Sequence, residues 1–201
     1  MMPKPAILLI GAGGHCKACI DVIEQSGQWQ IAGIVDRKGS GVEDVLGYPV
    51  IGCDEDLPRL RQEFDYAFVT VGQLGSVELK IKLFNHLKAL GFKQPGLVSP
   101  LAYVSKHAQI GEGTIVMHYA MLNASARVAS NCIINSHALI EHDALIEDHC
   151  HVSTGAKING GAQLGQACFV GSGAILKQNV IRVCSENINH CFKTKILVFV
   201  V

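Results

Sequence analysis

Aliphatic residues recur at every sixth position through the second half of the chain. The thirteen positions are Val104, Ile110, Val116, Leu122, Val128, Ile134, Ile140, Ile146, Val152, Ile158, Leu164, Val170 and Leu176. Two residues before each lies a small side chain, mostly alanine or cysteine. A helix repeats its apolar residues at three- and four-residue spacing and an amphipathic strand at two, so neither element fits a strict six. This hexapeptide repeat is the sequence form of a parallel β-helix.

One hexad predicts a short strand and a turn, with the aliphatic and the small residue facing inward by strand alternation. Three hexads would close one triangular coil, so residues eighteen apart should stack. The small-column residues Cys132, Cys150 and Cys168 have this spacing and should form one inward ladder. Free cysteine behaves as a small buried hydrophobe, so we interpret the ladder as packing and predict no metal site.

Residues 1–95 follow another pattern and predict a small Rossmann-like α/β domain. Apolar runs indicate parallel strands at Ala6–Ile10, Ile31–Val35 and Tyr66–Val71. Helical patterns follow the first strand and occur at Glu55–Phe64 and Val77–Leu90. Ligands of such sheets bind beyond the carboxyl ends of the strands, where the loops Gly11–His15, Asp36–Lys38 and Gly72–Gln73 should converge.

The glycine-rich loop Gly11–His15 lies between a strand and a helix. Glycines there let the backbone approach a phosphate, and the helix supplies amide donors and a positive dipole end. The dinucleotide fingerprint would need glycine at position 16, where the chain has Cys16, so the loop favours a pyrophosphate-bearing ligand other than NAD. A tight turn without a ligand is an equally open interpretation. Asp36 could hold ribose or sugar hydroxyls, or be a solvated residue at a strand end.

Composition limits the remaining classes. The chain has 17 basic and 17 acidic residues, which gives no polyanion-binding surface and makes nucleic acid an unexpected partner. The longest apolar stretch, Ile196–Val201, is too short to span a bilayer. The eight cysteines follow no secretory leader, so we expect a reducing cytoplasm. Cys16 and Cys19 form a CxxC inside the predicted helix, where a structural role is favoured over zinc binding.

Four histidines fall close together in the repeat, at positions 137, 142, 149 and 151. Acyl transfer to an amine or hydroxyl needs a proton acceptor near neutrality, and histidine is the usual one. His142 lies two residues past inward Ile140, at a predicted turn, and Asp143 beside it could orient the imidazole and raise its basicity. Each histidine alone is more often a hydrogen-bonded surface residue.

Two groups of motifs resemble the bacterial nucleotide-sugar acetyltransferases. They are Gly11–His15 with Asp36–Gly39 in the first half, and Asn135–Asp143 with His151–Lys157 in the second. That family includes UDP-4-amino-sugar N-acetyltransferases and sialic acid O-acetyltransferases. The resemblance covers residues 6 to about 180 and implies a left-handed β-helix, a homotrimer with each active site between two subunits, and acetyl-CoA as co-substrate.

The resemblance also implies the role of each site residue. His142 would take a proton from the sugar 4-amino group as it attacks the thioester, and Asp143 would enhance its basicity. Asn135 would lie near the reacting groups, His151 would contact acetyl-CoA, and Gly160 and Ser172 would line the pantetheine groove. In the first domain, the UDP-sugar pocket would comprise Gly13, Gly14, His15, Asp36, Arg37 and Gly72.

The proline- and glycine-containing segment Gly91–Pro100 separates the two periodicities, so we predict domains 1–95 and 96–180. The aliphatic column then fails at Arg182, which predicts a divergent tail over 181–201 and weaker coenzyme A binding than in relatives.

The function that we predict first is N-acetylation of a nucleotide-linked amino-deoxy sugar in glycan biosynthesis. The alternatives are O-acetylation of a sialic acid and a catalytically impaired binding or assembly subunit.

Overall fold

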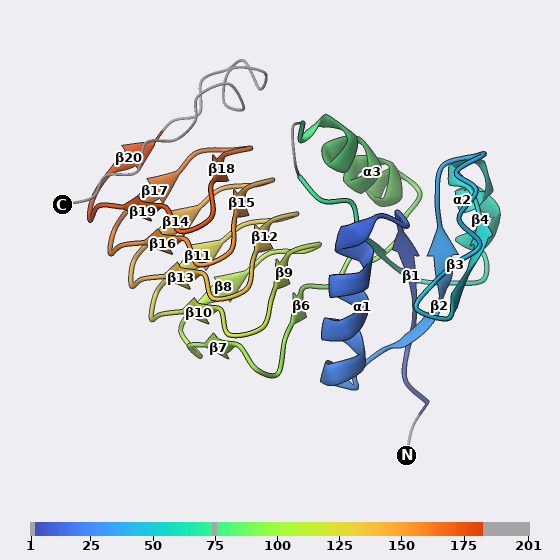
Figure 1. The fold of residues 1–201 in the computed structure, drawn as a ribbon, viewed down its shortest axis with the longest axis horizontal. Helices are drawn as coiled ribbons and strands as arrows, with labels where there is room; N and C mark the ends of the chain where they lie inside the picture. Colours follow the sequence, from blue (N-terminus) through green and yellow to red (C-terminus); the bar gives the residue numbers. More distant parts are fainter. Residues whose placement is uncertain (1–2, 74–75, 183–201) are drawn as a thin grey trace. The chain divides into compact units, whose positions relative to one another are not determined.

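The computed structural model describes residues 3–73 and 76–182, and the divergent tail predicted from the sequence lies mostly outside them. The chain folds into two compact units (Figure 1). One unit runs to Gly72 and includes Glu78–Pro95, and the other comprises Gln73–Val77 and the chain from Gly96 onward. We describe the two units separately.

The first unit is built on a five-stranded sheet in the order β3-β4-β2-β1-β5. Strands β4, β2, β1 and β5 are parallel, and β3 and β4 form an antiparallel hairpin that the sequence pattern did not reveal. The strand bounds are β1 Ala6–Ile10, β2 Gln30–Val35, β3 Asp44–Val45, β4 Tyr48–Gly52 and β5 Tyr66–Val69. Leu8, Ile10 and Val69 are buried in its core, as expected for strands covered on both faces.

The helices of this unit are α1 (Gly14–Ser26), α2 (Leu57–Leu60) and α3 (Glu78–Ala89). Gly27 forms the C-cap of α1, with a left-handed φ of 63°. The predicted helix Glu55–Phe64 is wrong in length. Only a 3₁₀ turn, η1 (Asp54–Asp56), and four α-helical residues form there. The following residues turn by i→i−3 bonds such as Glu63 N–H to Leu60 C=O, so the helix does not continue.

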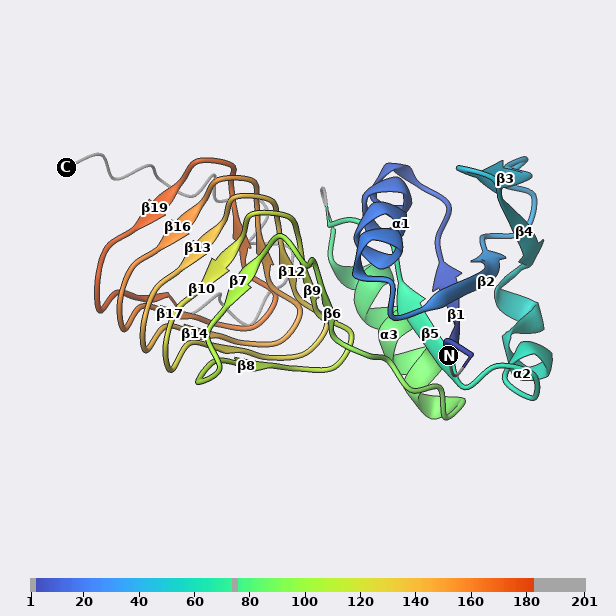
Figure 2. The same ribbon diagram turned by 90° about the horizontal axis from the view of Figure 1, so that it is seen from below.

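The second unit is a parallel β-helix of two-residue strands, seen nearly along its axis in Figure 2. Its strands form three flat five-stranded sheets, with orders β19-β16-β13-β10-β7, β20-β17-β14-β11-β8 and β18-β15-β12-β9-β6. The strand bounds are β6 Leu97–Val98, β7 Tyr103–Val104, β8 Gln109–Ile110, β9 Ile115–Val116, β10 Met121–Leu122, β11 Arg127–Val128, β12 Ile133–Ile134, β13 Leu139–Ile140, β14 Leu145–Ile146, β15 His151–Val152, β16 Lys157–Ile158, β17 Gln163–Leu164, β18 Phe169–Val170, β19 Ile175–Leu176 and β20 Ile181–Arg182.

Residues eighteen apart are paired throughout this unit. Leu122 lies beside Ile140, and Ile140 beside Ile158, in the register of one full coil. The aliphatic and the small column together fill the interior from Val116 to Leu176, and Cys132, Cys150 and Cys168 are buried in it. The predicted α/β-plus-β-helix class is therefore confirmed, including the inward cysteine ladder.

The corners of the coil turn at a third column, directly before each small residue. At every sixth position from Gly113 to Asn179 the backbone φ is positive, between 55° and 69°. Four of these twelve residues are glycine and three are Asn or Asp, the types that adopt this conformation most readily. The bend of each corner therefore lies one residue before the small column.

None of the helices in the described ranges is both long enough and apolar enough to cross a membrane. Strand pairing in the β-helix extends to β20, where Arg182 lies opposite Leu164 of β17.

Candidate functional site

The pair His142 and Asp143 lies at the corner between β13 and β14. The Nδ1 atom of His142 is 2.8 Å from the Oδ2 atom of Asp143, and the two side chains are 57% and 66% exposed. Asp143 adopts a left-handed φ of 60°, so it is the turn residue of this corner. The turn therefore presents both side chains outward, because the inward positions on either side are taken by Ile140 and Ala144.

This contact alters the acid-base properties of the histidine. Chiefly because of the hydrogen bond to Asp143, the pKa of His142 is raised above its ordinary value. The carboxylate acceptor also fixes the tautomer in which Nδ1 carries the proton and Nε2 is free to accept one. An exposed imidazole prepared in this way can act as a general base.

Gly160 lies one coil further along the same corner, beneath the His142 ring. The two coils are tied together by the backbone bond from Gly161 N–H to His142 C=O, at 3.0 Å. Three of the predicted site residues, His142, Asp143 and Gly160, are thus brought together by the fold.

The other predicted residues of the β-helix gather at a different corner, between the sheets of β12 and β13. There the Nδ2 atom of Asn135 lies 3.4 Å from Nε2 of His151, and Ser172 Oγ is 2.9 Å from Ser153 Oγ. Ser153 was not predicted as a site residue. Within one chain, a full strand of the intervening sheet separates this corner from that of His142.

A shallow hollow of about 330 Å³ begins at Asp143 and runs over the sheet of β11, β14 and β17. It is lined by Ser125, Arg127, Asp143, Ala144, Leu145 and Gln163, four of which are polar or charged. Arg127 is exposed, and none of the ion pairs between described residues includes it. Ser125, Arg127 and Gln163 could not be predicted from the sequence, because they approach Asp143 only through the eighteen-residue repeat.

In the α/β unit, the loops that follow β1, β2 and β5 meet at one end of the sheet. The backbone N–H of Ala12 donates to Asp36 Oδ1 at 3.2 Å, which ties the first two loops together. A methyl group added to Gly72 would lie 3.5 Å from His15 Cβ, so the third loop lies against the first. Gly13 forms the N-cap of α1, with no side-chain hydrogen bond on it.

The surroundings of these loops leave room for a ligand. A Cβ added to Gly13 or Gly14 would meet no neighbouring atom within 4 Å. In the second loop, the side chain of Arg37 is exposed. The first turn of α1 carries no acidic residue. The amide groups at this helix start can therefore receive an anion such as a phosphate.

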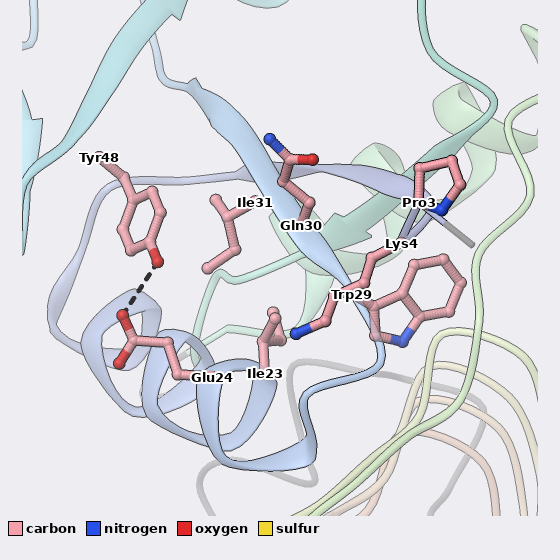
Figure 3. A pocket seen from close by; sticks show the side chains of 8 residues that line it. All are labelled: Pro3, Lys4, Ile23, Glu24, Trp29, Gln30, Ile31 and Tyr48. Carbon is pink, nitrogen blue, oxygen red and sulfur yellow. Dashed lines mark hydrogen bonds between the residues drawn. The ribbon is translucent and has the colours of Figure 1, made fainter. Parts of the chain in front are cut away.

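A larger hollow of about 490 Å³ lies at the opposite, amino-terminal end of the same sheet (Figure 3). Tyr48 donates to Glu24 at 2.9 Å across it, and the lining residues are Pro3, Lys4, Ile23, Glu24, Trp29, Gln30, Ile31 and Tyr48. Ligands of parallel α/β sheets bind at the carboxyl ends of the strands, so we assign no function to this hollow.

The cysteines of the CxxC are packed into the α/β unit. Cys16 and Cys19 are free, fully buried residues of α1, and burial is the main cause that raises the pKa of each thiol. Protonated thiols are poor metal ligands, which fits the structural role predicted for them. Over the described ranges, no group of three or more His, Cys, Asp or Glu residues could hold a metal ion.

Two protein families match the chain: the PglD N-terminal domain over residues 6–87, and the bacterial transferase hexapeptide family, with six repeats, over residues 107–142. Perosamine N-acetyltransferase from Caulobacter crescentus, solved with CoA and GDP-perosamine, is 28% identical with a TM-score of 0.76, covering 90% of this chain and 91% of its own. The acetyltransferase domain of PglB from Neisseria gonorrhoeae FA1090, in complex with acetyl coenzyme A, is 32% identical with a TM-score of 0.80, covering 89% and 85%. The chain belongs to the nucleotide-sugar acetyltransferase family.

Membership of the nucleotide-sugar acetyltransferases confirms the resemblance that the motifs indicated and makes the chain an acetyltransferase. The family match extends over both units, since one family covers the α/β unit and the other covers the coils that end at His142. The roles of the individual site residues stay predictions.

Proposed function

We propose that the chain is an acetyl-CoA-dependent N-acetyltransferase that modifies the 4-amino group of a nucleotide-linked amino-deoxy sugar in bacterial glycan biosynthesis. The observation that carries the proposal is the exposed His142 imidazole, whose Nδ1 is held by Asp143 at 2.8 Å on a corner of a hexapeptide β-helix. Two structural relatives contain CoA or acetyl-CoA, and one of them also contains GDP-perosamine, a nucleotide-linked amino sugar.

The chemistry requires one base and two oriented substrates. The sugar amine attacks the thioester carbonyl carbon, forming a C–N bond, while Nε2 of His142 accepts a proton from the nitrogen. The tetrahedral intermediate collapses with cleavage of the C–S bond, and the imidazolium returns the proton to the departing thiolate of coenzyme A. No covalent enzyme intermediate is needed, since placing the two substrates together can supply much of the rate.

In this proposal the α/β unit binds the nucleotide part of the acceptor. The nucleotide phosphates bind at the start of α1, near Gly13, Gly14 and His15, with Asp36, Arg37 and Gly72 around them. The support is the open backbone at the two glycines and the convergence of the three loops. A nucleoside diphosphate such as UDP fits this position.

We further propose that the active enzyme is a homotrimer. The support is that Asn135, His151 and Ser172 lie at one corner of the prism, whereas His142 lies at another. A neighbouring copy that brings its Asn135 corner to the His142 corner would assemble base, amide and coenzyme groove in one cleft. Closed rotational symmetry repeats such a heterologous contact until the ring is complete.

The reaction is assigned to the cytoplasm. The support is that Cys16, Cys19, Cys132 and Cys150 are buried free thiols, which suit a reducing compartment, whereas Cys168 is disulfide-bonded.

The proposal is tested by measuring release of free coenzyme A thiol from acetyl-CoA. UDP- and GDP-linked 4-amino-4,6-dideoxy sugars are compared with sialic acid as acceptors. Rapid thiol release with a nucleotide amino sugar is expected, and it should fall at least about 100-fold in His142→Gln. His107→Gln, at another exposed histidine of the β-helix, is the matched control and should keep full activity. Release with sialic acid alone would favour the O-acetyltransferase, and unchanged turnover in His142→Gln would contradict the assigned base.

A further inference from the structure

The imidazole of His142 lies over a residue that has no side chain. A methyl group added to the Cα of Gly160 would lie 2.8 Å from both Cε1 and Nε2 of the ring, and 3.4 Å from Nδ1. Contacts below 3.0 Å between a Cβ and a ring atom do not persist, so the ring can occupy its place only while position 160 is bare.

The backbone does not explain why this residue is glycine. In the turn below the histidine, the left-handed conformation belongs to Gly161, with φ of 65°, whereas the φ of Gly160 lies outside that region. At the equivalent positions one coil before His142 and one coil after Gly160, the chain carries Ala124 and Gln178. The corner therefore accepts side chains elsewhere in this column.

The ring is restrained on two sides. Asp143 holds Nδ1 at 2.8 Å, and the bare Cα of Gly160 lies against the edge that carries Cε1 and Nε2. Nε2 is the nitrogen that accepts the proton in the proposed reaction. Because the side chain is otherwise 57% exposed, the packing against Gly160 is the contact that defines the direction of this atom.

We propose that Gly160 is a positioning residue for the general base, and that the missing side chain at position 160 sets the orientation of the His142 ring. This inference rests on the proposed function and deepens it. It differs from the role implied by family resemblance, in which the backbone at Gly160 lines the pantetheine groove. The two roles make different predictions for a methyl group at this position.

The decisive variant is Gly160→Ala. The atoms that must move are the end of an exposed, flexible side chain, so the fold tolerates the methyl group and the melting temperature should change by less than about 2 °C. The ring is displaced from its productive direction, so kcat should fall by about 10- to 100-fold. The KM values for acetyl-CoA and for the nucleotide sugar should each stay within about twofold.

A second readout follows the histidine itself, without turnover. The displaced ring loosens its hydrogen bond to Asp143, so the NMR titration of the His142 imidazole should move to lower pH in Gly160→Ala. The His142 signal is assigned by its absence in His142→Gln. Gly96→Ala is the matched control, because a methyl group there meets neighbours only at 3.5 Å or more and should change neither kcat nor the titration.

Three outcomes would overturn the proposal. They are a raised KM for acetyl-CoA with unchanged kcat, an unchanged His142 titration in a folded Gly160→Ala protein, and a Gly160→Ala protein that fails to fold. Failure of the proposed function would look different, because the wild-type protein would then release no thiol with any amino sugar. The NMR comparison would still report on the position of the ring in that case.

Discussion

Asp143 serves both as the turn residue of its corner and as the partner of the imidazole. Its φ of 60° is a conformation in which Asp and Asn are tolerated and most other side chains are strained. Its carboxylate accepts the hydrogen bond that raises the pKa of His142. The two roles of Asp143 can be separated by Asp143→Asn, because asparagine is compatible with the turn but carries no charge.

Asp143→Asn should change the pH dependence of the enzyme in a defined direction. In the wild type the raised pKa keeps the imidazole protonated, and unable to accept a proton, up to a higher pH than for an isolated histidine. Without the carboxylate the pKa falls, so the acidic limb of kcat/KM moves to lower pH. The plateau value of kcat/KM at higher pH should drop by about 10- to 100-fold, because the base is weaker and less well oriented. The measurement is a pH–rate profile for both proteins, and an unshifted limb would contradict the assignment.

At the residue scale, the pair of site residues that could be matched from the sequence alone is adjacent in the chain. His142 and Asp143 could be paired because a turn places neighbours side by side. Gly160 was predicted for another role, and Arg127 and Gln163 were not predicted at all. These three residues lie near His142 and Asp143 only because one coil contains eighteen residues. No local sequence pattern indicates which residues stack in this way.

At the scale of elements, the two-residue strands depend on the interior for their stability. Each strand adds few backbone bonds, and the stacked column Leu122, Ile140, Ile158 and Leu176 is buried along the axis. Burial of each aliphatic side chain contributes roughly 1.5–3 kcal/mol relative to an exposed one. The hexad pattern predicted this column because it reports burial directly.

Removing one member of the column should destabilise the β-helix strongly. We expect Ile140→Ala to lower the free energy of unfolding by about 2–5 kcal/mol, since the neighbours above and below prevent the cavity from closing. Lys157→Ala, on the exposed side of β16, should change it by less than about 0.5 kcal/mol. Urea denaturation followed by circular dichroism compares the two. Equal midpoints would show that the interior is not tightly packed at Ile140.

The corners were harder to predict than the strands. Turn positions of the coil include Tyr119, Ser125 and Ala167, residue types with no strong preference for a positive φ. Here the tertiary requirement of closing a triangular coil overrides local propensity. The short α2 shows the converse, since the residues Glu55–Phe64 have a helical pattern but form only one α-helical turn.

At the scale of the whole molecule, one face of the β-helix is unusually apolar. Four exposed residues on its first coils, Leu101, Tyr103, Tyr119 and Met121, are between 42% and 58% accessible. Met121 of β10 pairs with Tyr103 of β7, so the two lie side by side on the same sheet. A contiguous apolar surface of this kind suits the subunit contact of the proposed homotrimer.

The shared site predicts recovery of activity between two inactive proteins. His142→Gln lacks the base and Asn135→Ala lacks the predicted amide, so each homotrimer should be nearly inactive. Co-expressed in equal amounts, they form mixed rings in which about a quarter of the sites pair an intact His142 with an intact Asn135 from its neighbour. Thiol release near one quarter of the wild-type rate is expected. No recovery in mixed trimers, confirmed by mass spectrometry, would place each site within one chain.

The eighteen-residue register also governs how such a chain can change in length. Because side chains alternate between inside and outside along every strand, deleting a single residue would reverse the facing of the rest of that strand and shift all later corners. Insertion or loss of a whole coil, by contrast, leaves every remaining residue on its original face. Gene variants of this protein should therefore tolerate length changes in steps of one turn of the prism, and the distance between the base and the end of the prism can lengthen or shorten without redesign of the interior.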